Sequence, residues 1–198
     1  VISCRYDVQG KLVYEEKAVS GEVRQVIHYG YDRAGRLTER KEELDSGLAP
    51  LEGEPRYAVT RYRYDGNGNR TGIVTPEGYR ILRSYDACDR LVSERVEDDK
   101  NGIDRTTSVT YDYAGNITRI VRSGKGLGEW EQGYGYDLKD RIVHVKDCLG
   151  PVFSYEYDKN DRRIVEILPQ TGMTENGKSG YPKNQNRYRY DVYGRLLT

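Results

Sequence analysis

The residues of this chain that could carry out chemistry are mainly aspartates, and eight of them follow a tyrosine in a recurring Tyr-Asp pair. Neighbouring carboxylates could act as a general acid and base, or could hold a calcium ion. The pairs are Tyr6-Asp7, Tyr31-Asp32, Tyr64-Asp65, Tyr85-Asp86, Tyr111-Asp112, Tyr136-Asp137, Tyr157-Asp158 and Tyr190-Asp191. Because they recur every 21 to 33 residues along the whole chain, they indicate a repeated structural unit.

The residue three positions after each aspartate explains the carboxylate in structural terms. It is glycine in five copies and aspartate in three, namely Gly10, Gly35, Gly68, Gly115, Gly194, Asp89, Asp140 and Asp161. An aspartate that opens a type I turn accepts hydrogen bonds from nearby backbone N–H groups. The residue that closes such a hairpin turn has a left-handed backbone conformation, which glycine and aspartate tolerate. We therefore interpret the eight aspartates of the pairs as turn residues.

The residues around each turn favour strands. In the last copy, Tyr188-Arg189-Tyr190-Asp191-Val192-Tyr193-Gly194-Arg195-Leu196, two tyrosines lie two residues apart and so share one face of a strand. The Arg-Leu that follows the glycine begins the return strand, so each copy predicts one β-hairpin. The fold class that follows is all-β, with repeated antiparallel hairpins that form a curved and twisted strip.

The repeat also predicts the domain organisation. Residues 1–198 form a single array of about eight hairpins that we expect to be a fragment of a longer protein. Polar segments near 41–59, 94–107 and 169–187 are predicted to be surface insertions. Because an isolated hairpin is marginally stable, the hairpins must stack on one another, and open sheet edges would permit self-association.

Histidine and cysteine give no recognisable site. His28 and His144 are the only histidines, and both lie in predicted strands without a catalytic motif around them. Cys4, Cys88 and Cys148 lack the CxxC spacing of a metal site. We therefore expect neither an enzyme nor a cofactor.

One stretch resembles the start of a calcium-binding loop. Asp65-Gly66-Asn67-Gly68-Asn69 has suitable oxygen ligands, but Arg70 and Pro76 stand where a calcium loop has glycine and glutamate. Asp65 and Gly68 also have turn roles already. The sequence therefore favours a hairpin turn over a metal site.

Composition excludes two classes of partner. The 32 basic and 32 acidic residues give zero net charge, which argues against a nucleic-acid partner. No run approaches the ~20 apolar residues that a membrane-spanning helix needs. We expect neither nucleic-acid binding nor a membrane span.

The repeated stretch Tyr-x-Tyr-Asp-x-x-Gly-Arg-Leu resembles the YD repeat of the RHS (rearrangement hotspot) family, and its eight copies cover nearly the whole chain. The resemblance implies a long β-strip wound into a hollow shell, as in bacterial polymorphic toxins, insecticidal toxin-complex subunits and the animal teneurins. In the toxins the shell encloses a C-terminal effector. A secreted or cell-surface location is implied as well.

Two further turns look like the Asp-Pro-x-Gly element of this family, which in the family also builds a self-cleaving aspartyl protease. They are Thr75-Pro76-Glu77-Gly78 and Asp147-Cys148-Leu149-Gly150. Thr75 replaces the acid in the first, and Cys148 replaces the proline in the second. Because neither motif is intact, no catalytic residue carries over to this chain.

These observations lead to one expected function and one alternative. We expect a non-enzymatic shell or scaffold segment of a large secreted or surface RHS-type protein, forming a wall that encapsulates a toxin. Its partners would be the rest of its own polypeptide, including further repeats and an enclosed C-terminal effector. Alternatively, the Tyr-rich faces could bind carbohydrate or a cell-surface partner, through an exposed cluster near Trp130 or Tyr113. Because the tyrosines recur in every unit, packing between strands is favoured over binding.

Overall fold

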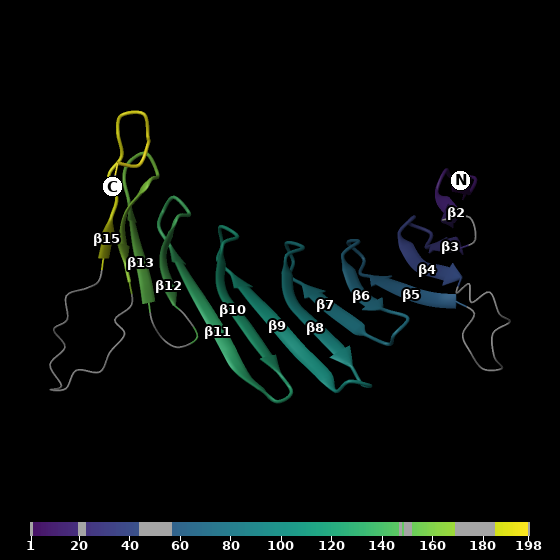
Figure 1. Cartoon of the computed structure of the whole chain (residues 1–198). Coiled ribbons are helices and arrows are strands. Elements are labelled where there is room, and N and C mark those ends of the chain that lie inside the picture. The colour runs from purple at the N-terminus through teal and green to yellow at the C-terminus, as the bar shows by residue number, and fades with distance from the viewer. Residues whose placement is uncertain are drawn as a thin grey trace. The chain divides into compact units, whose positions relative to one another are not determined.

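A computed structural model describes residues 2–19, 23–43, 57–146, 148, 152–168 and 185–197. Fifteen strands form in these residues and follow one another in chain order in one sheet (Figure 1). Their bounds are β1 Ile2–Tyr6, β2 Leu12–Val19, β3 Val23–Tyr31, β4 Leu37–Glu43, β5 Tyr57–Tyr64, β6 Arg70–Val74, β7 Arg80–Tyr85, β8 Leu91–Asp98, β9 Ile103–Tyr111, β10 Ile117–Gly124, β11 Leu127–Tyr136, β12 Ile142–Lys146, β13 Val152–Tyr157, β14 Arg163–Ile167 and β15 Gln185–Arg187. The described residues contain no helix, and the all-β prediction is confirmed.

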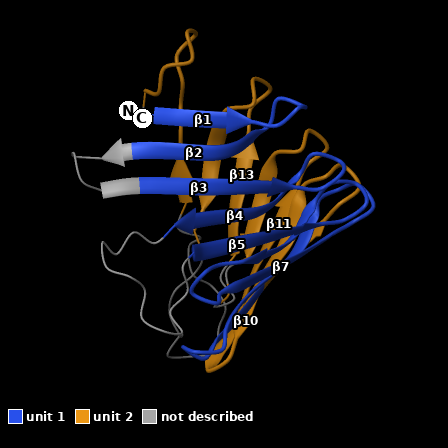
Figure 2. Ribbon diagram, turned by 90° about the vertical axis from the view of Figure 1, so that its right-hand side faces the viewer, with its two compact units in different colours: residues 1–106 blue, residues 107–198 orange. Residues whose placement is uncertain are grey.

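The chain divides into two compact units, residues 1–106 and residues 107–198 (Figure 2). Within each unit the strands form a single twisted layer in which strands that follow one another along the chain pair in antiparallel fashion. Such a meander needs only short connections, which the Tyr-Asp turns supply. Among the described strands, β1 and β15 stand at the two ends of the strand order, and self-association through them remains a prediction.

The predicted surface insertions differ from the structure in one clear case. Residues 94–107 are almost entirely strand, because β8 runs to Asp98 and β9 begins at Ile103, so the prediction of an insertion there is wrong. The polar residues mislead because they alternate on a sheet face where cross-strand pairs such as Arg95 with Asp104 satisfy their charges. Of the other two segments, residues 44–56 and 169–184 lie outside the described residues, and the flanking ends belong to β4, β5 and β15.

Each Tyr-Asp turn is closed by the same two backbone hydrogen bonds. In the turn at Asp137, the N–H of Asp140 donates to the carbonyl of Asp137 at 3.0 Å, and the N–H of Asp137 donates to the carbonyl of Arg141 at 3.0 Å. The other seven turns repeat this pair of bonds. The residue fourth after each tyrosine has a positive φ, between 59° and 98°, and the sheet register shifts at the tyrosine in each turn where the register is described. These are the features of a type I turn followed by a bulge residue.

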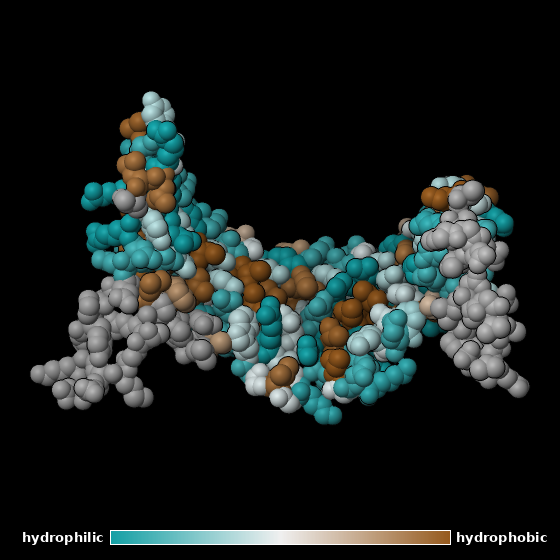
Figure 3. Space-filling model, viewed as in Figure 1, coloured by the Kyte–Doolittle hydropathy of each residue, from teal (hydrophilic) through white to brown (hydrophobic). Residues whose placement is uncertain are grey.

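A single-layer sheet leaves little room for a core. Among the described residues only Val26, Ile27 and Val165 are buried apolar side chains. Figure 3 shows hydrophobic residues on the visible face interrupted everywhere by hydrophilic ones. Stability must therefore come largely from contacts between neighbouring strands and turns.

The turn geometry predicts different responses at two glycines of one turn. Gly68 has a φ of +98°, whereas Gly66 has no positive φ and no atom within 4 Å of a Cβ placed there. We expect Gly68→Ala to lower the free energy of unfolding by about 1–2 kcal/mol, because alanine is strained in the left-handed region. Gly66→Ala, the matched control, should change it by less than about 0.5 kcal/mol. Urea unfolding measures both, and equal effects would contradict the turn assignment.

Candidate functional site: the contacts that join consecutive hairpins

The aspartate of each Tyr-Asp pair organises its own turn. In the turn at Asp137, Oδ1 accepts the backbone N–H groups of Lys139 at 2.9 Å and of Arg141 at 3.1 Å. Oδ2 accepts the Arg141 Nε–H at 2.7 Å. The Arg141 guanidinium, aided by these backbone bonds, lowers the pKa of Asp137 to about 2. A carboxylate held in this way is a fixed anion that orients an arginine, and not a general acid.

The oriented arginine reaches the next hairpin. Arg141 places its guanidinium carbon 4.7 Å from the ring centre of Tyr157 and donates from Nη1 to the backbone carbonyl of Asp158 at 3.1 Å. Arg36 repeats both contacts with the following hairpin, over the Tyr64 ring at 5.0 Å and to the Asp65 carbonyl at 2.8 Å. Arg162 does the same with the hairpin at Tyr190. In these three turns a cation–π contact and a hydrogen bond together join the turn to its successor.

The tyrosines of the pairs also bond to the preceding hairpin. The hydroxyl groups of six of these tyrosines each donate to a backbone carbonyl of the preceding hairpin. That carbonyl always belongs to the residue six positions after the tyrosine of the preceding hairpin's own pair. The bonds run from Tyr31 to Leu12 (2.8 Å), Tyr64 to Leu37 (2.8 Å), Tyr85 to Arg70 (3.1 Å), Tyr136 to Ile117 (2.8 Å), Tyr157 to Ile142 (2.7 Å) and Tyr190 to Arg163 (2.9 Å). Seven of the eight tyrosines are half-buried, and Tyr6 of the first hairpin is 62% exposed. The tyrosines of the pairs thus contact the neighbouring hairpin without being fully buried.

Two hairpins carry asparagine where the others carry arginine or lysine. Asn69 and Asn116 still donate to the aspartate of their own turn, at 3.1 Å in both cases. Their second contact goes to the left-handed aspartate of the next hairpin: Asn69 Nδ2 to Asp89 Oδ1 at 2.6 Å, and Asn116 Nδ2 to Asp140 Oδ1 at 2.7 Å. The third left-handed aspartate, Asp161, accepts from Arg141 Nη1 at 2.7 Å. The sequence interpretation missed this role, although Asn preceding Asp in successive turns is a visible signal.

The other predicted chemical groups do not converge. His28 lies between the rings of Tyr14 and Tyr57, with Nε2 3.1 Å from Glu43 Oε1, whereas His144 Nδ1 lies 3.0 Å from Ser154 Oγ in the other unit. Cys4, Cys88 and Cys148 are exposed. In the described part of the chain, no group of three or more His, Cys, Asp or Glu side chains could hold a metal ion. No helix there is long and apolar enough to cross a membrane.

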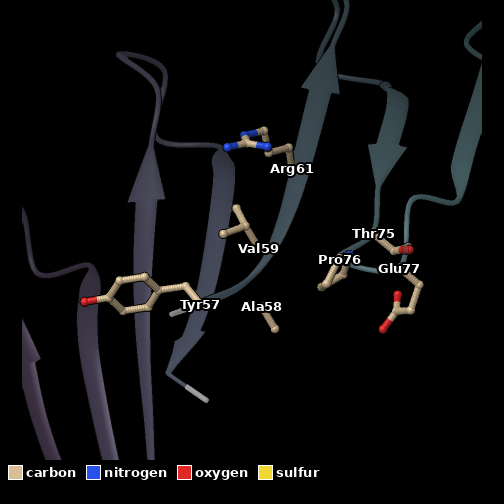
Figure 4. A pocket seen from close by; sticks show the side chains of 7 residues that line it. All are labelled: Tyr57, Ala58, Val59, Arg61, Thr75, Pro76 and Glu77. Atoms are coloured by element: carbon tan, nitrogen blue, oxygen red, sulfur yellow. The ribbon is translucent and has the colours of Figure 1, made fainter. Parts of the chain in front are cut away.

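A hollow of about 420 Å³ lies in unit 1, between β5 and the turn at residues 75–78 (Figure 4). Its charged lining residues are Arg61 and Glu77, and the lining includes no histidine or cysteine. The turn itself matches the expectation for this stretch, since the Gly78 N–H donates to the Thr75 carbonyl at 3.1 Å and Gly78 has a φ of +100°. Of the related turn at 147–150, only Cys148 is among the described residues.

The aromatic residues named for the alternative function lie in different settings. Tyr113 is fully exposed at the tip of the turn after Asp112. Trp130 is half-buried, with the Arg122 guanidinium 4.8 Å from its ring. An aromatic ring that is already covered by a guanidinium offers less free surface for a ligand.

Comparison with known proteins agrees with the repeat geometry. Residues 1–172 match the family model described as Teneurin YD-shell. The chain is 31% identical over 186 residues to the probable deoxyribonuclease RhsB of Dickeya dadantii (strain 3937), a match that covers 84% of this chain and 11% of RhsB. It is 39% identical over 70 residues to the probable deoxyribonuclease RhsA of the same organism, which covers 35% of this chain and 4% of RhsA. The chain thus spans about a tenth of the length of RhsB.

Solved structures that match the chain include the crystal structure of TcdB2-TccC3-Cdc42, with a TM-score of 0.48, 16% identity, and coverage of 99% of this chain and 12% of that chain. The crystal structure of TcdB2-TccC3 without the hypervariable C-terminal region gives a TM-score of 0.49 at the same identity and coverage. The resemblance of the Tyr-Asp repeat to the RHS family is confirmed by the family match. Because that match extends over residues 1–172 of a 198-residue chain whose turns repeat one set of contacts, the chain belongs to the Teneurin YD-shell family.

Proposed function

We propose that this chain is a non-enzymatic wall segment of a large secreted or cell-surface RHS-type protein, and that the wall encloses an effector carried by the same polypeptide. One observation carries the proposal. The aspartates of the Tyr-Asp pairs, the residues best suited to chemistry, are engaged in turns and in contacts that join hairpins. A chain that uses its acidic residues in this way builds a continuous sheet.

The family membership supports the same conclusion. A shell wall needs a long sheet assembled from similar local units, and six junctions have a hydroxyl, an amide or a guanidinium contact between neighbouring hairpins. The relatives RhsB and RhsA are both named as probable deoxyribonucleases. Since this chain spans 11% of RhsB, we assign the wall function to it and no nuclease activity.

The carbohydrate-binding alternative has less support. The rings of Tyr64, Tyr157 and Tyr190 each lie under an arginine of the preceding hairpin, and their hydroxyl groups are already bonded to backbone carbonyls. Tyr113 is exposed, but a single ring at a turn tip is a small platform for a sugar. We therefore retain the wall as the proposed function.

Protease accessibility tests enclosure directly. In the full-length protein, we expect the enclosed polypeptide to resist digestion, and Tyr157→Ala, which removes a contact between hairpins, to accelerate its cleavage at least tenfold. Tyr113→Ala is the matched control, because its side chain is exposed and should not affect the wall. Rapid digestion of the remaining polypeptide in the unaltered protein would show that this wall encloses nothing.

A further inference from the structure

Two positions of consecutive hairpins meet at five of the described junctions. We call the residue five positions after the tyrosine of a pair the junction residue, and the residue four positions after it the left-handed residue. The junction residues are Lys11, Arg36, Asn69, Arg90, Asn116, Arg141, Arg162 and Arg195. The left-handed residues are Gly10, Gly35, Gly68, Asp89, Gly115, Asp140, Asp161 and Gly194. Each of the first seven junction residues is followed in the next hairpin by one left-handed residue.

The two asparagine junction residues both face an aspartate. Asn69 Nδ2 donates to Asp89 Oδ1 at 2.6 Å, and Asn67 Nδ2 donates to the same oxygen at 2.8 Å. Asn116 Nδ2 donates to Asp140 Oδ1 at 2.7 Å. These bonds cross from one turn to the next, over sequence separations of 20 to 24 residues.

Side-chain length explains why the asparagines need this partner. A long arginine such as Arg36 reaches the backbone carbonyl of Asp65 at 2.8 Å, so that no side-chain acceptor is required at the next left-handed residue, Gly68. The asparagine amide lies only two carbons from its own backbone and makes its contact when a carboxylate extends toward it. The aspartate at the left-handed position provides that carboxylate.

Glycine at the left-handed position is compatible with the long side chains. A Cβ on Gly35 would lie 2.6 Å from Lys11 Nζ, the end of a flexible side chain, and a Cβ on Gly194 would lie in ordinary contact, 3.9 Å from Arg162 Nη1. A Cβ on Gly68 would have no atom within 4 Å. Arg141 shows that arginine also tolerates aspartate, because it bonds both the Asp158 carbonyl at 3.1 Å and Asp161 Oδ1 at 2.7 Å. Arginine therefore accepts either residue, and both asparagines are paired with aspartate.

Without a contact across the junction, aspartate would be less favourable than glycine at the left-handed position. Asp89, Asp140 and Asp161 have φ values of 59°, 59° and 64°, in the region where glycine is relaxed and other residues are strained. All three are exposed, so burial does not explain them. A contact across the junction gives the reason for their presence.

We propose that the junction residue and the following left-handed residue form a pairing rule that specifies which hairpin can follow which. Asparagine requires aspartate in the next turn, and arginine or lysine is compatible with glycine. The rule concerns the order of hairpins in the sheet, and it stands whether or not the wall encloses an effector.

A matched pair of substitutions in the full-length chain tests the rule. Asp140→Gly removes the carboxylate that Asn116 contacts in the next hairpin, whereas Asp161→Gly leaves Arg141 bonded to the Asp158 carbonyl. Both substitutions have the same effect on a left-handed backbone. Asp161→Gly also removes the contacts of Asp161 Oδ1 with Arg141 Nη1 at 2.7 Å and Lys139 Nζ at 3.1 Å, so a smaller effect of Asp161→Gly is a stringent sign that arginine tolerates glycine in the next turn. We expect amide hydrogen exchange in β10 and β11 to accelerate about three- to tenfold in Asp140→Gly, and exchange in β12 and β13 to accelerate less than twofold in Asp161→Gly.

A compensating substitution completes the experiment. In the double variant Asn116→Arg with Asp140→Gly, exchange in β10 and β11 should return to within about twofold of the unaltered protein, since arginine with glycine restores an allowed pair. If Asp140→Gly unfolds the protein altogether, restored folding in the double variant supports the rule, and failure to restore it overturns the rule. Equal acceleration in the two single variants, or slower exchange in Asp140→Gly, would also overturn the rule and leave the aspartates as mere substitutes for glycine.

Discussion

Acidification from about pH 4 to about pH 2 is expected to destabilise the sheet progressively, because its turns are closed by aspartates that bind protons more weakly in the folded protein. The pKa of Asp137 falls from 3.8 to about 2, chiefly through the Arg141 guanidinium. The pKa is also lowered, chiefly by the backbone N–H four residues later, in Asp32, Asp86, Asp158 and Asp191. The pKa is lowered in Asp65 and Asp112 as well. Partial desolvation raises the pKa of these two carboxyl groups, but their hydrogen bonds, led by those from Asn69 and Asn116, lower it by more.

The direction of the effect follows from the lowered pKa. Each carboxylate contributes stability that is fully present above its unfolded pKa, near 3.8 for Asp137, and that is lost as the pH falls toward its folded pKa, about 2 for the same residue. Seven turns have an aspartate whose pKa is lowered from 3.8, so their losses all begin near that pH and act on the same sheet. The melting temperature should therefore change little from pH 7 to pH 5 on account of these groups and decline below pH 4.

The measurement is the melting temperature at intervals between pH 7 and pH 2, at about 0.15 M salt so that exposed charges are screened. Asp137→Asn removes one of the titrating groups and should melt below the unaltered protein at pH 7. The difference between the two proteins should shrink as the pH approaches 2, because protonation removes the same charge from Asp137. A constant difference across that range would mean that the Asp137 carboxylate contributes nothing as an anion.

The local part of this fold could be predicted from the sequence because it depends on single residues. A left-handed position accepts glycine or aspartate and little else, so comparison of eight copies identifies it, and the φ values of Gly10 and Asp89, 78° and 59°, agree. Alternating tyrosines likewise indicate strands, and strands are found there. In each case the physical cause lies within a few residues of its effect.

The contacts between hairpins could not be predicted in the same way. Arg141 and Tyr157 are 16 positions apart, and no local rule states that a guanidinium will cover that ring. Segment 94–107 was misjudged for a related reason, since its charges are satisfied by residues on a neighbouring strand. The polar character of the junction residue was evident in the sequence, but its partner becomes visible only when two turns lie side by side.

Replacement of Tyr157 by alanine is expected to have the largest effect of any single substitution at a junction. The residue is half-buried, its ring lies 4.7 Å below the Arg141 guanidinium, and its hydroxyl donates to the Ile142 carbonyl at 2.7 Å. Tyr157→Ala removes all of these contacts together with the apolar surface of the ring. We expect the free energy of unfolding to fall by roughly 2–3 kcal/mol, somewhat below the value for a fully buried aromatic residue.

Two further variants separate the contributions to that loss. Tyr157→Phe keeps the ring under Arg141 and removes only the hydroxyl, so it should cost about 0.5–1.5 kcal/mol. Tyr113→Ala removes a tyrosine from a turn tip where the side chain is fully exposed, and it should change stability by less than about 0.5 kcal/mol. Urea unfolding of the three variants gives the order directly. If Tyr157→Ala were no more destabilising than Tyr113→Ala, the tyrosines of the pairs would not be what joins one hairpin to the next, and the wall would have to be stabilised by other contacts.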